Sequence, residues 1–270
     1  MDVDLNDLPK MRYYKQKWVL YNMESPANTE HLRKSLQNLQ ENIDWMLTYR
    51  RDSDIYSPYG YTKANTRPKN ISLNLTNKKR EVAWFVSNCD TPGKREDFVR
   101  ELAKYVEIDI YGNCGDFKCD KSSYYKCLEM VETNYKFYLS FENSLCKDYV
   151  TEKLFRVMSY NVIPIVFGGA EYREILPPNS FIDALAFKNP RELSVHLKEI
   201  SNNLTLQMKY FEWKRYYSIV DNISNGLCLL CDKLIETNLN SQNGHHTTKL
   251  KRDLIKWWFD DANCTSWSSL

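Results

Sequence analysis

Short apolar runs alternate with amphipathic segments between residues 82 and 203, and this alternation restricts the possible folds strongly. Four runs are typical of buried strands: VAWFVSN (82 to 88), IDIYGNCG (108 to 115), YKFYLSFEN (135 to 143) and VIPIVFGG (162 to 169). Three amphipathic segments have helical spacing: REDFVRELAKYV (95 to 106), TEKLFRVMSYN (151 to 161) and RELSVHLKEISNN (191 to 203). Strands joined by single helices pair in parallel through right-handed crossovers. The sequence therefore predicts an α/β protein with a doubly wound parallel sheet.

The first 80 residues form a separate region with a different pattern. A short strand is expected at residues 18 to 21, a helix at 29 to 42, and a buried strand at 45 to 50. The charged run that follows, residues 50 to 54, could be a solvated turn, but its position directly after a buried strand favours a cluster of mixed salt bridges. Residues 62 to 80 are rich in Asn, Thr, Lys and Arg, which predicts a linker or surface loop.

Composition excludes several classes of protein. With 43% hydrophobic and 27% charged residues in 270, the chain can bury a globular core. A net charge of +2 gives no reason to expect nucleic acid as a partner, because such proteins carry strongly basic surfaces. The 19 Tyr and 7 Trp suit the binding of sugar rings, although aromatic residues also fill protein cores.

Cysteines and glycosylation sequons together indicate the secretory pathway. The chain has eight Cys, and disulfides persist mainly in oxidising compartments. Its five Asn-X-Ser/Thr sequons begin at Asn70, Asn74, Asn203, Asn222 and Asn263. The N-terminal residues have no apolar signal region, and no apolar span of ~20 residues follows.

The segment from residue 141 to 169 carries the clearest chemical signal. A parallel strand ending at Phe141 delivers Glu142 and Asn143 to the edge where ligands bind in such sheets. A helix capped by Thr151 then begins with Glu152 and Lys153. A lysine in the first turn opposes the helix dipole and needs a compensating anion, for which the diphosphate of a sugar nucleotide is suitable. The alternative is a Lys153 that extends to water and a Glu152 that only stabilises the helix end.

Five motifs in the same order resemble the α1,3/4-fucosyltransferase family. They are MESP (23 to 26), TYRRDSDIYSPYG (48 to 60), VSNC followed by Arg95, FENSLCKDYVTEKLF (141 to 155) and VIPIVFGG. The resemblance covers about residues 18 to 259, and it is closest to invertebrate members. It implies a GT-B fold, which has two Rossmann-like domains with parallel sheets. Residues 1 to 80 would be an incomplete acceptor-binding domain with a linker, residues 81 to 259 the GDP-fucose-binding domain, and residues 260 to 270 a tail.

The resemblance also implies an activity: transfer of L-fucose from GDP-fucose, with inversion, to the 3-hydroxyl of N-acetylglucosamine in a glycoprotein N-glycan. The acceptor would be the glycan core or an antenna. No metal or other cofactor would be needed, because cationic side chains face the diphosphate. Localisation would be the Golgi lumen, with the full-length form a type II protein of the Golgi cisterna membrane. Membrane attachment would come only through an anchor that this chain lacks.

Individual roles follow from the same resemblance. Lys153 and Arg95 match residues that hold the donor phosphates, and Glu24 matches the carboxylate proposed as general base. The remaining matches lie in the donor pocket: Glu152, Asn143 and Tyr149. Because family members normally carry further residues before the first motif, a second hypothesis is an impaired homologue that binds GDP-fucose or glycan without turnover. A third is a nucleotide-sugar transferase without fucose preference.

The remaining Cys and His residues leave several possibilities open. Cys228 and Cys231 could form a redox pair, half of a zinc site or a short disulfide, and a structural bridge is our prediction. Cys114 and Cys119 follow a turn and could also pair. The pair His245-His246 lies in a polar stretch that is typical of a solvated loop rather than a metal site.

Overall fold

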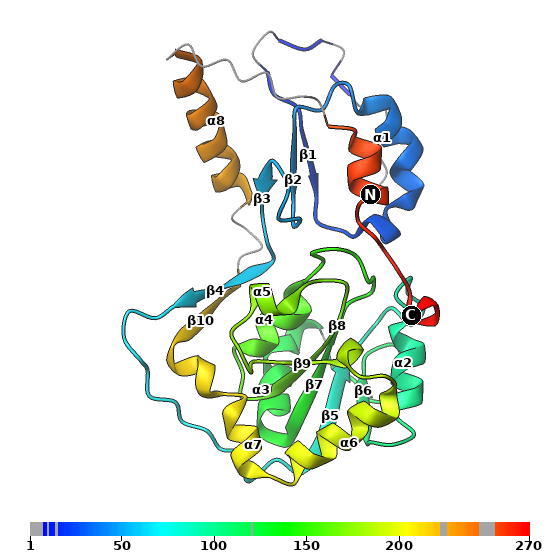
Figure 1. Ribbon diagram of the computed structural model, residues 1–270, viewed down its shortest axis with the longest axis vertical. Coiled ribbons are helices and arrows are strands. Elements are labelled where there is room, and N and C mark those ends of the chain that lie inside the picture. The colour runs from blue at the N-terminus through cyan, green and yellow to red at the C-terminus, as the bar shows by residue number, and fades with distance from the viewer. Residues whose placement is uncertain (1–7, 10, 14–15, 120, 222–225, 243–251) are drawn as a thin grey trace.

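The chain folds into two α/β units joined by a short ribbon (Figure 1). The structure, a computed structural model, describes residues 8–9, 11–13, 16–119, 121–221, 226–242 and 252–270. A three-stranded sheet forms the centre of the smaller unit, and a five-stranded sheet forms the centre of the larger one.

The larger sheet is entirely parallel and has the strand order β6-β5-β7-β8-β9. Its strands are β5 (Arg80–Phe85), β6 (Ile108–Tyr111), β7 (Tyr135–Phe141), β8 (Ile163–Phe167) and β9 (Ile182–Asp183). Six of the seven residues of β7 are buried, because this central strand is covered on both faces.

Helices cover both faces of this sheet. Phe98 on α2 (Arg95–Leu102) and Leu197 on α6 (Pro190–Ser201) pack on one face. Leu128 on α3 (Tyr124–Asn134) and Val157 on α4 (Glu152–Met158) pack on the other. The chain continues through α5 (Tyr172–Ile175) and α7 (Leu204–Lys209). The predicted doubly wound arrangement is confirmed.

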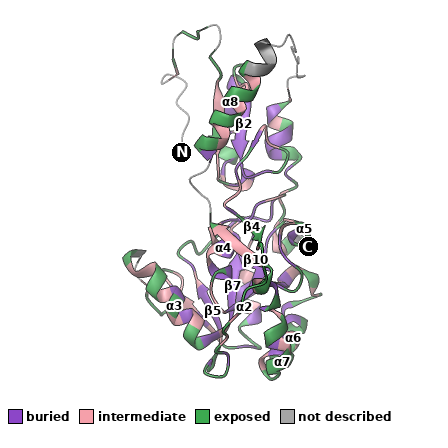
Figure 2. Ribbon diagram, turned by 90° about the vertical axis from the view of Figure 1, so that its left-hand side faces the viewer, coloured by how far each residue is buried: buried purple, intermediate pink, exposed green. Residues whose placement is uncertain are grey.

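The smaller sheet is also parallel, with the order β1-β2-β3. Its strands are β1 (Val19–Asn22), β2 (Trp45–Thr48) and β3 (Ile55–Tyr56). All four residues of β2 are buried, as Figure 2 shows by colour. The expected helix at residues 29 to 42 is shorter, since α1 spans Arg33–Leu39 after a 3-10 turn.

C-terminal segments return to the smaller sheet. Leu229 and Leu230 of α8 (Gly226–Gln242) pack against Trp45 and Leu47. A π-helical turn at Lys256–Asp260 packs with α1 in another cluster (Figure 1). The expected domain boundaries at residues 80 and 259 placed α8 and most of the π-helical turn in the second domain, whereas both pack on the smaller unit.

Residues 62 to 80, predicted as linker or loop, begin with part of a strand. Here β4 (Gly60–Ala64) pairs antiparallel with β10 (Tyr217–Asp221) in a two-stranded ribbon. The ribbon joins two parts of the chain that bracket the larger unit. Within the described residues, no helix is long and apolar enough to cross a membrane.

Candidate functional site

The Glu24 loop follows β1 and is the part of the smaller unit that carries a candidate base. Among the described residues, the hydrogen bonds to the Glu24 carboxylate all end on Oε1. Tyr149 Oη donates at 2.6 Å, Ser25 N at 2.9 Å and Asn28 Nδ2 at 3.1 Å. Burial raises the pKa of Glu24, but these three donors and the Lys153 ammonium outweigh it, so the pKa lies below its ordinary value. Glu24 is therefore a carboxylate at neutral pH, with Oε2 left to accept a proton.

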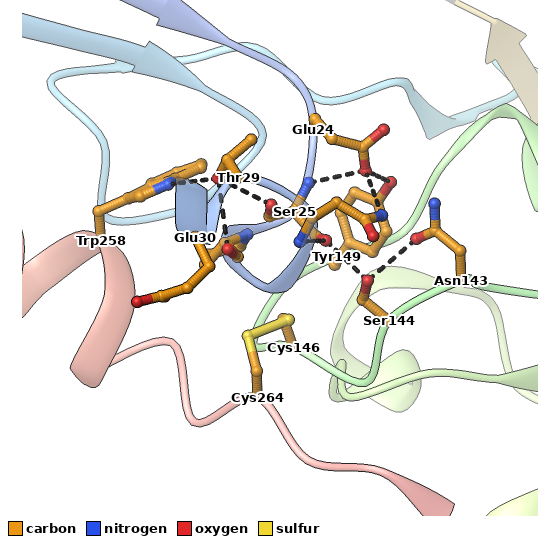
Figure 3. Close-up of a disulfide and its surroundings, with 12 residues drawn as sticks. Glu24, Ser25, Thr29, Glu30, Asn143, Ser144, Cys146, Tyr149, Trp258 and Cys264 are labelled. Atoms are coloured by element: carbon orange, nitrogen blue, oxygen red, sulfur yellow. Dashed lines mark hydrogen bonds between the residues drawn. A yellow bond between two sulfur atoms is a disulfide. The ribbon is translucent and has the colours of Figure 1, made fainter. Parts of the chain in front are cut away.

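The larger unit holds this loop in place. Ser25 Oγ and Ser144 Oγ form a buried hydrogen bond of 2.7 Å, and Ser144 Oγ also lies 3.1 Å from Asn143 Oδ1 (Figure 3). Tyr59, in the turn before β4, donates its hydroxyl to Met23 O directly before Glu24. The base candidate is thus fixed by side chains from both units.

Lys153 lies in the first turn of α4, as the sequence predicts, but its compensating anion is a side chain. Nζ lies 3.3 Å from Oε2 of Glu142 and 2.9 Å from Thr151 Oγ1. Glu142 is fully buried, directly after β7. Burial lowers the pKa of Lys153, but Glu142 and Glu152 more than offset this, and the pKa lies above its ordinary value.

The helix N-terminus is less open than the sequence suggests. Thr151 is the N-cap, as predicted, and its hydroxyl accepts from Lys153 N. Thr151 N donates to Glu142 Oε1 at 2.7 Å. The helix has seven residues, and these backbone donors already have partners. Glu152 is half-buried, with Oε1 3.6 Å from Lys153 Nζ.

Arg95 opens α2 at the same edge of the larger sheet, and it is more buried than a phosphate-binding residue was expected to be. Its guanidinium donates to Phe141 O at 2.6 Å, to Asn88 O at 3.2 Å and to Glu96 at 3.3 Å. It therefore ties the ends of β5 and β7 together. It also lies close enough to Lys153 to lower the pKa of that lysine.

Asn143 and Tyr149 have contacts that refine their predicted roles. Asn143 O accepts from Gly93 N at 2.9 Å, which holds the loop before α2 against the loop after β7. A Cβ at Gly93 would lie 3.2 Å from that oxygen, so the close approach favours glycine. Tyr149 is buried and contacts the base candidate rather than only lining a donor pocket.

The sequence prediction missed Glu142, Tyr59 and Ser144 as contributors to this site. Glu142 was placed at the correct edge of the sheet but given no role. The demand of Lys153 for a compensating anion was the signal that could have identified it. Tyr59 and Ser144 act through contacts between distant segments, which spacing along one sequence does not reveal.

Two adjoining cavities lie near this site. The larger, about 620 Å³, is lined by Arg51, Asp52, Lys147, Asp148, Gly169, Glu171, Glu174 and Asn263. The smaller, about 360 Å³, shares Gly169 and Glu171 and also reaches Asp183. The predicted salt-bridge cluster is confirmed here, since Arg51 pairs with Glu174 and Lys147 pairs with Asp52. Among the described residues, no group of three or more His, Cys, Asp or Glu could hold a metal ion.

Disulfides are present as expected, but their pairing differs from the possibilities that the sequence offered. Cys114 bonds to Cys89 rather than to Cys119, and it joins the loops after β5 and β6. Cys119 bonds to Cys127 in α3. The third bridge, Cys146–Cys264, joins the loop after β7 to the C-terminal segment (Figure 3).

Cys228 and Cys231 are exposed and free in the first turns of α8, where the sequence analysis predicted a bridge. Both thiols lie on a regular helix that packs through Leu229 and Leu230 instead. Four sequon asparagines lie at exposed positions: Asn70, Asn74, Asn203 and Asn263. Asn222 and the His245-His246 pair lie outside the described residues.

The two parallel sheets, with an acidic loop on one and a cationic strand edge on the other, are the arrangement expected of a glycosyltransferase of the GT-B type. The sequence model "Glycosyltransferase family 10 (fucosyltransferase) C-term" matches residues 75–257, and "Fucosyltransferase, N-terminal" matches residues 1–60. The chain therefore belongs to glycosyltransferase family 10, the fucosyltransferases.

Curated relatives agree with this assignment. An alpha-(1,3)-fucosyltransferase C of Drosophila melanogaster is 36% identical over 97% of this chain and 64% of its own length. The glycoprotein 3-alpha-L-fucosyltransferase A of the same organism is 37% identical over 93% of this chain and 49% of its own. An alpha-(1,3)-fucosyltransferase of Caenorhabditis elegans is 41% identical over 81% of this chain and 50% of its own length. The chain thus spans about half to two thirds of the length of these relatives.

A solved structure is similar at lower identity. A crystal structure of an alpha1,3-fucosyltransferase with GDP-fucose is 20% identical and has a TM-score of 0.48. The similarity covers 65% of this chain and 50% of that one.

Proposed function

We propose that this chain transfers L-fucose from GDP-fucose, with inversion, to the 3-hydroxyl of N-acetylglucosamine in a glycoprotein N-glycan. The main supporting observation is an ionised Glu24 on one unit that receives a hydrogen bond from Tyr149 of the other unit and lies within electrostatic reach of Lys153. The names of the curated relatives support fucose and the 3-linkage, and one of them names a glycoprotein acceptor.

The proposed reaction is a single displacement. The acceptor 3-oxygen attacks C1 of fucose from the face opposite the diphosphate, and Glu24 Oε2 takes its proton. The bond between C1 and the phosphate oxygen breaks, and GDP leaves with the electron pair. Lys153 and Arg95 stabilise the negative charge that develops on the diphosphate. We propose that these cations take the place of a metal ion, so that transfer persists in excess chelator.

The other donor contacts are proposed from their positions. Glu152, half-buried beside Lys153, would accept hydrogen bonds from donor hydroxyls. Asn143 would offer its side-chain amide at the same strand edge. Tyr149 would connect the donor side to the base.

We also propose a Golgi lumenal location, where the three disulfides of the described residues would persist. The exposed sequon asparagines are suitable for N-glycosylation in that pathway. The acceptor N-acetylglucosamine belongs to the glycan core or to an antenna.

Transfer of labelled fucose to a panel of core and antennal N-glycans tests the proposal. We expect product with the unmodified chain in the presence of chelator, and loss of at least about 100-fold in kcat/KM for Glu24→Gln. Glu30→Gln, an exposed carboxylate just beyond the same loop, is the matched control. Equal activity of Glu24→Gln and the control would reject Glu24 as the base. GDP-fucose binding without product from any acceptor would favour the impaired homologue.

A further inference from the structure

Glu142 is a fully buried carboxylate that the proposed reaction does not use. It follows the central strand β7, and its own backbone N donates to Phe167 O of β8 at 2.9 Å. Burying a carboxylate is costly unless its oxygens are hydrogen-bonded or paired with a cation. Glu142 therefore needs a structural or functional reason to occupy this position.

Its oxygens hold the start of α4. Oε1 accepts from Thr151 N at 2.7 Å, and the Thr151 hydroxyl lies 3.0 Å from Oε1 and 2.9 Å from Oε2. Oε2 also lies 3.3 Å from Lys153 Nζ. The Glu142 side chain thus accepts a hydrogen bond from the backbone of the N-cap residue, Thr151, and forms an ion pair with Lys153.

The Lys153 ammonium is held by two neighbouring groups. An ammonium has three N–H groups. One donates to Thr151 Oγ1 at 2.9 Å, and Glu142 Oε2 forms an ion pair with the ammonium at 3.3 Å. Glu152 Oε1, at 3.6 Å, lies beyond hydrogen-bond distance. With the ammonium held by one hydrogen bond and one ion pair, the N–H directed away from both has a limited range of directions, and 28% of the Lys153 side chain is exposed.

We propose that Glu142 is a positioning residue, which with Thr151 holds the Lys153 ammonium so that its remaining N–H faces the diphosphate of the donor. This inference rests on the proposed function, in which Lys153 binds the donor phosphates. Glu142 itself touches neither donor nor acceptor. An ordinary structural carboxylate would stabilise α4 but would not control how GDP binding depends on pH.

The charges around Lys153 make that distinction measurable. Glu142 at the end of β7 and Glu152 on α4 favour its charged form, while Arg95 on α2 opposes it. Glu24 in the β1 loop and Tyr124 on α3 also interact with it electrostatically. If the Glu142 charge is removed, burial and Arg95 act with less opposition, and Lys153 loses its proton at a lower pH. As the pH is raised, GDP affinity should therefore begin to fall at a lower pH in this variant than in the wild type.

Calorimetric titration of GDP between pH 6.5 and 11.5 tests the proposal with Glu142→Gln. We expect GDP binding about tenfold weaker at pH 7 and an alkaline limit lower by about one pH unit. Asp183→Asn is the matched control, because Asp183 also accepts a backbone N–H, from Leu185 at 3.0 Å, near the end of β9 in the same sheet. This control should retain wild-type affinity and the wild-type alkaline limit. Unchanged or tighter GDP binding by Glu142→Gln would overturn the proposal.

A second variant covers the case in which Glu142→Gln does not fold. Thr151→Val removes the bridging hydroxyl but keeps the Glu142 charge beside Lys153. We expect weaker GDP binding with the alkaline limit unchanged, and wild-type affinity would overturn the proposal. If Lys153→Ala binds GDP as the wild type does, the proposed donor site fails together with this inference. If Lys153→Ala loses binding while Glu142→Gln and Thr151→Val keep it, only the positioning role fails.

Discussion

At the residue scale, Glu24 is controlled mainly by hydrogen bonds. Tyr149, Ser25 and Asn28 all donate to one of its oxygens, and together they keep its pKa low despite the partial loss of solvent around the carboxylate. In the proposed reaction, a low pKa would make Glu24 a weaker base but would keep it ionised when the acceptor hydroxyl binds. The hydrogen bonds thus increase the ionised fraction of this carboxylate at the expense of its strength as a base.

Tyr149→Phe should therefore change the pH dependence of transfer. Loss of the 2.6 Å hydrogen bond removes a donor that stabilises the Glu24 carboxylate, so the pKa of Glu24 rises. Glu24 then becomes protonated at higher pH, and the acidic limb of kcat/KM moves upward by about one pH unit. The measurement is a pH profile of kcat/KM from pH 4 to 8.

Tyr59→Phe is the control for that profile. Its hydroxyl donates to the backbone at Met23 rather than to the Glu24 carboxylate. We expect a change in rate without movement of the acidic limb. Identical profiles for Tyr149→Phe and wild type would contradict the role assigned to Tyr149.

At the element scale, the strands of the larger sheet could be predicted and several of their partners could not. The predicted runs at 108 to 115, 135 to 143 and 162 to 169 each contain an observed strand, and the run at 82 to 88 overlaps β5, which begins two residues earlier. Apolar runs of that length are typical of strands buried on both faces of a parallel sheet. The ribbon β4–β10 escaped prediction because its residues are largely exposed or half-buried, and because they pair across about 150 residues of chain.

The disulfides show the same limit. Spacing suggested that near neighbours would pair, yet Cys146 bonds to Cys264 across 118 residues. Which cysteines meet depends on the return of the C-terminal segment to the smaller sheet. That return depends in turn on the buried side chains of Trp257 and Trp258, whose partners are distant in sequence.

The long bridge should contribute more to stability than the short one. Replacing Cys146 and Cys264 by Ser frees a loop with a sequence separation of 118, against 8 for Cys119 and Cys127. In the chain-entropy account, the difference is about 2 kcal/mol in the free energy of unfolding. Denaturant unfolding of the two double variants measures it. Equal losses would show that strain or residual structure outweighs loop length.

At the scale of the whole molecule, the two units are joined at the site itself. The contact Ser25–Ser144, the contact Glu24–Tyr149 and the bridge Cys146–Cys264 all involve the loop between β7 and α4 (Figure 3). This loop also leads into Thr151 and Lys153, so the donor side and the base side share one support. The neighbourhood of Asn143, Tyr149, Glu152 and Lys153 could be predicted from the sequence, because these residues lie close together in one motif, and their donor roles stay a prediction. The link to Glu24 could not, since it joins residues 125 positions apart.

The central claim is a division of labour between Lys153, which holds the diphosphate, and Glu24, which accepts the proton. The most direct measurement compares Glu24→Gln and Lys153→Ala in two assays, GDP binding by calorimetry and a single turnover of GDP-fucose with a saturating acceptor. We expect Glu24→Gln to bind GDP with wild-type affinity but to lose turnover, and Lys153→Ala to bind GDP at least about tenfold more weakly. Wild-type GDP affinity in Lys153→Ala, or full turnover in Glu24→Gln, would contradict this account.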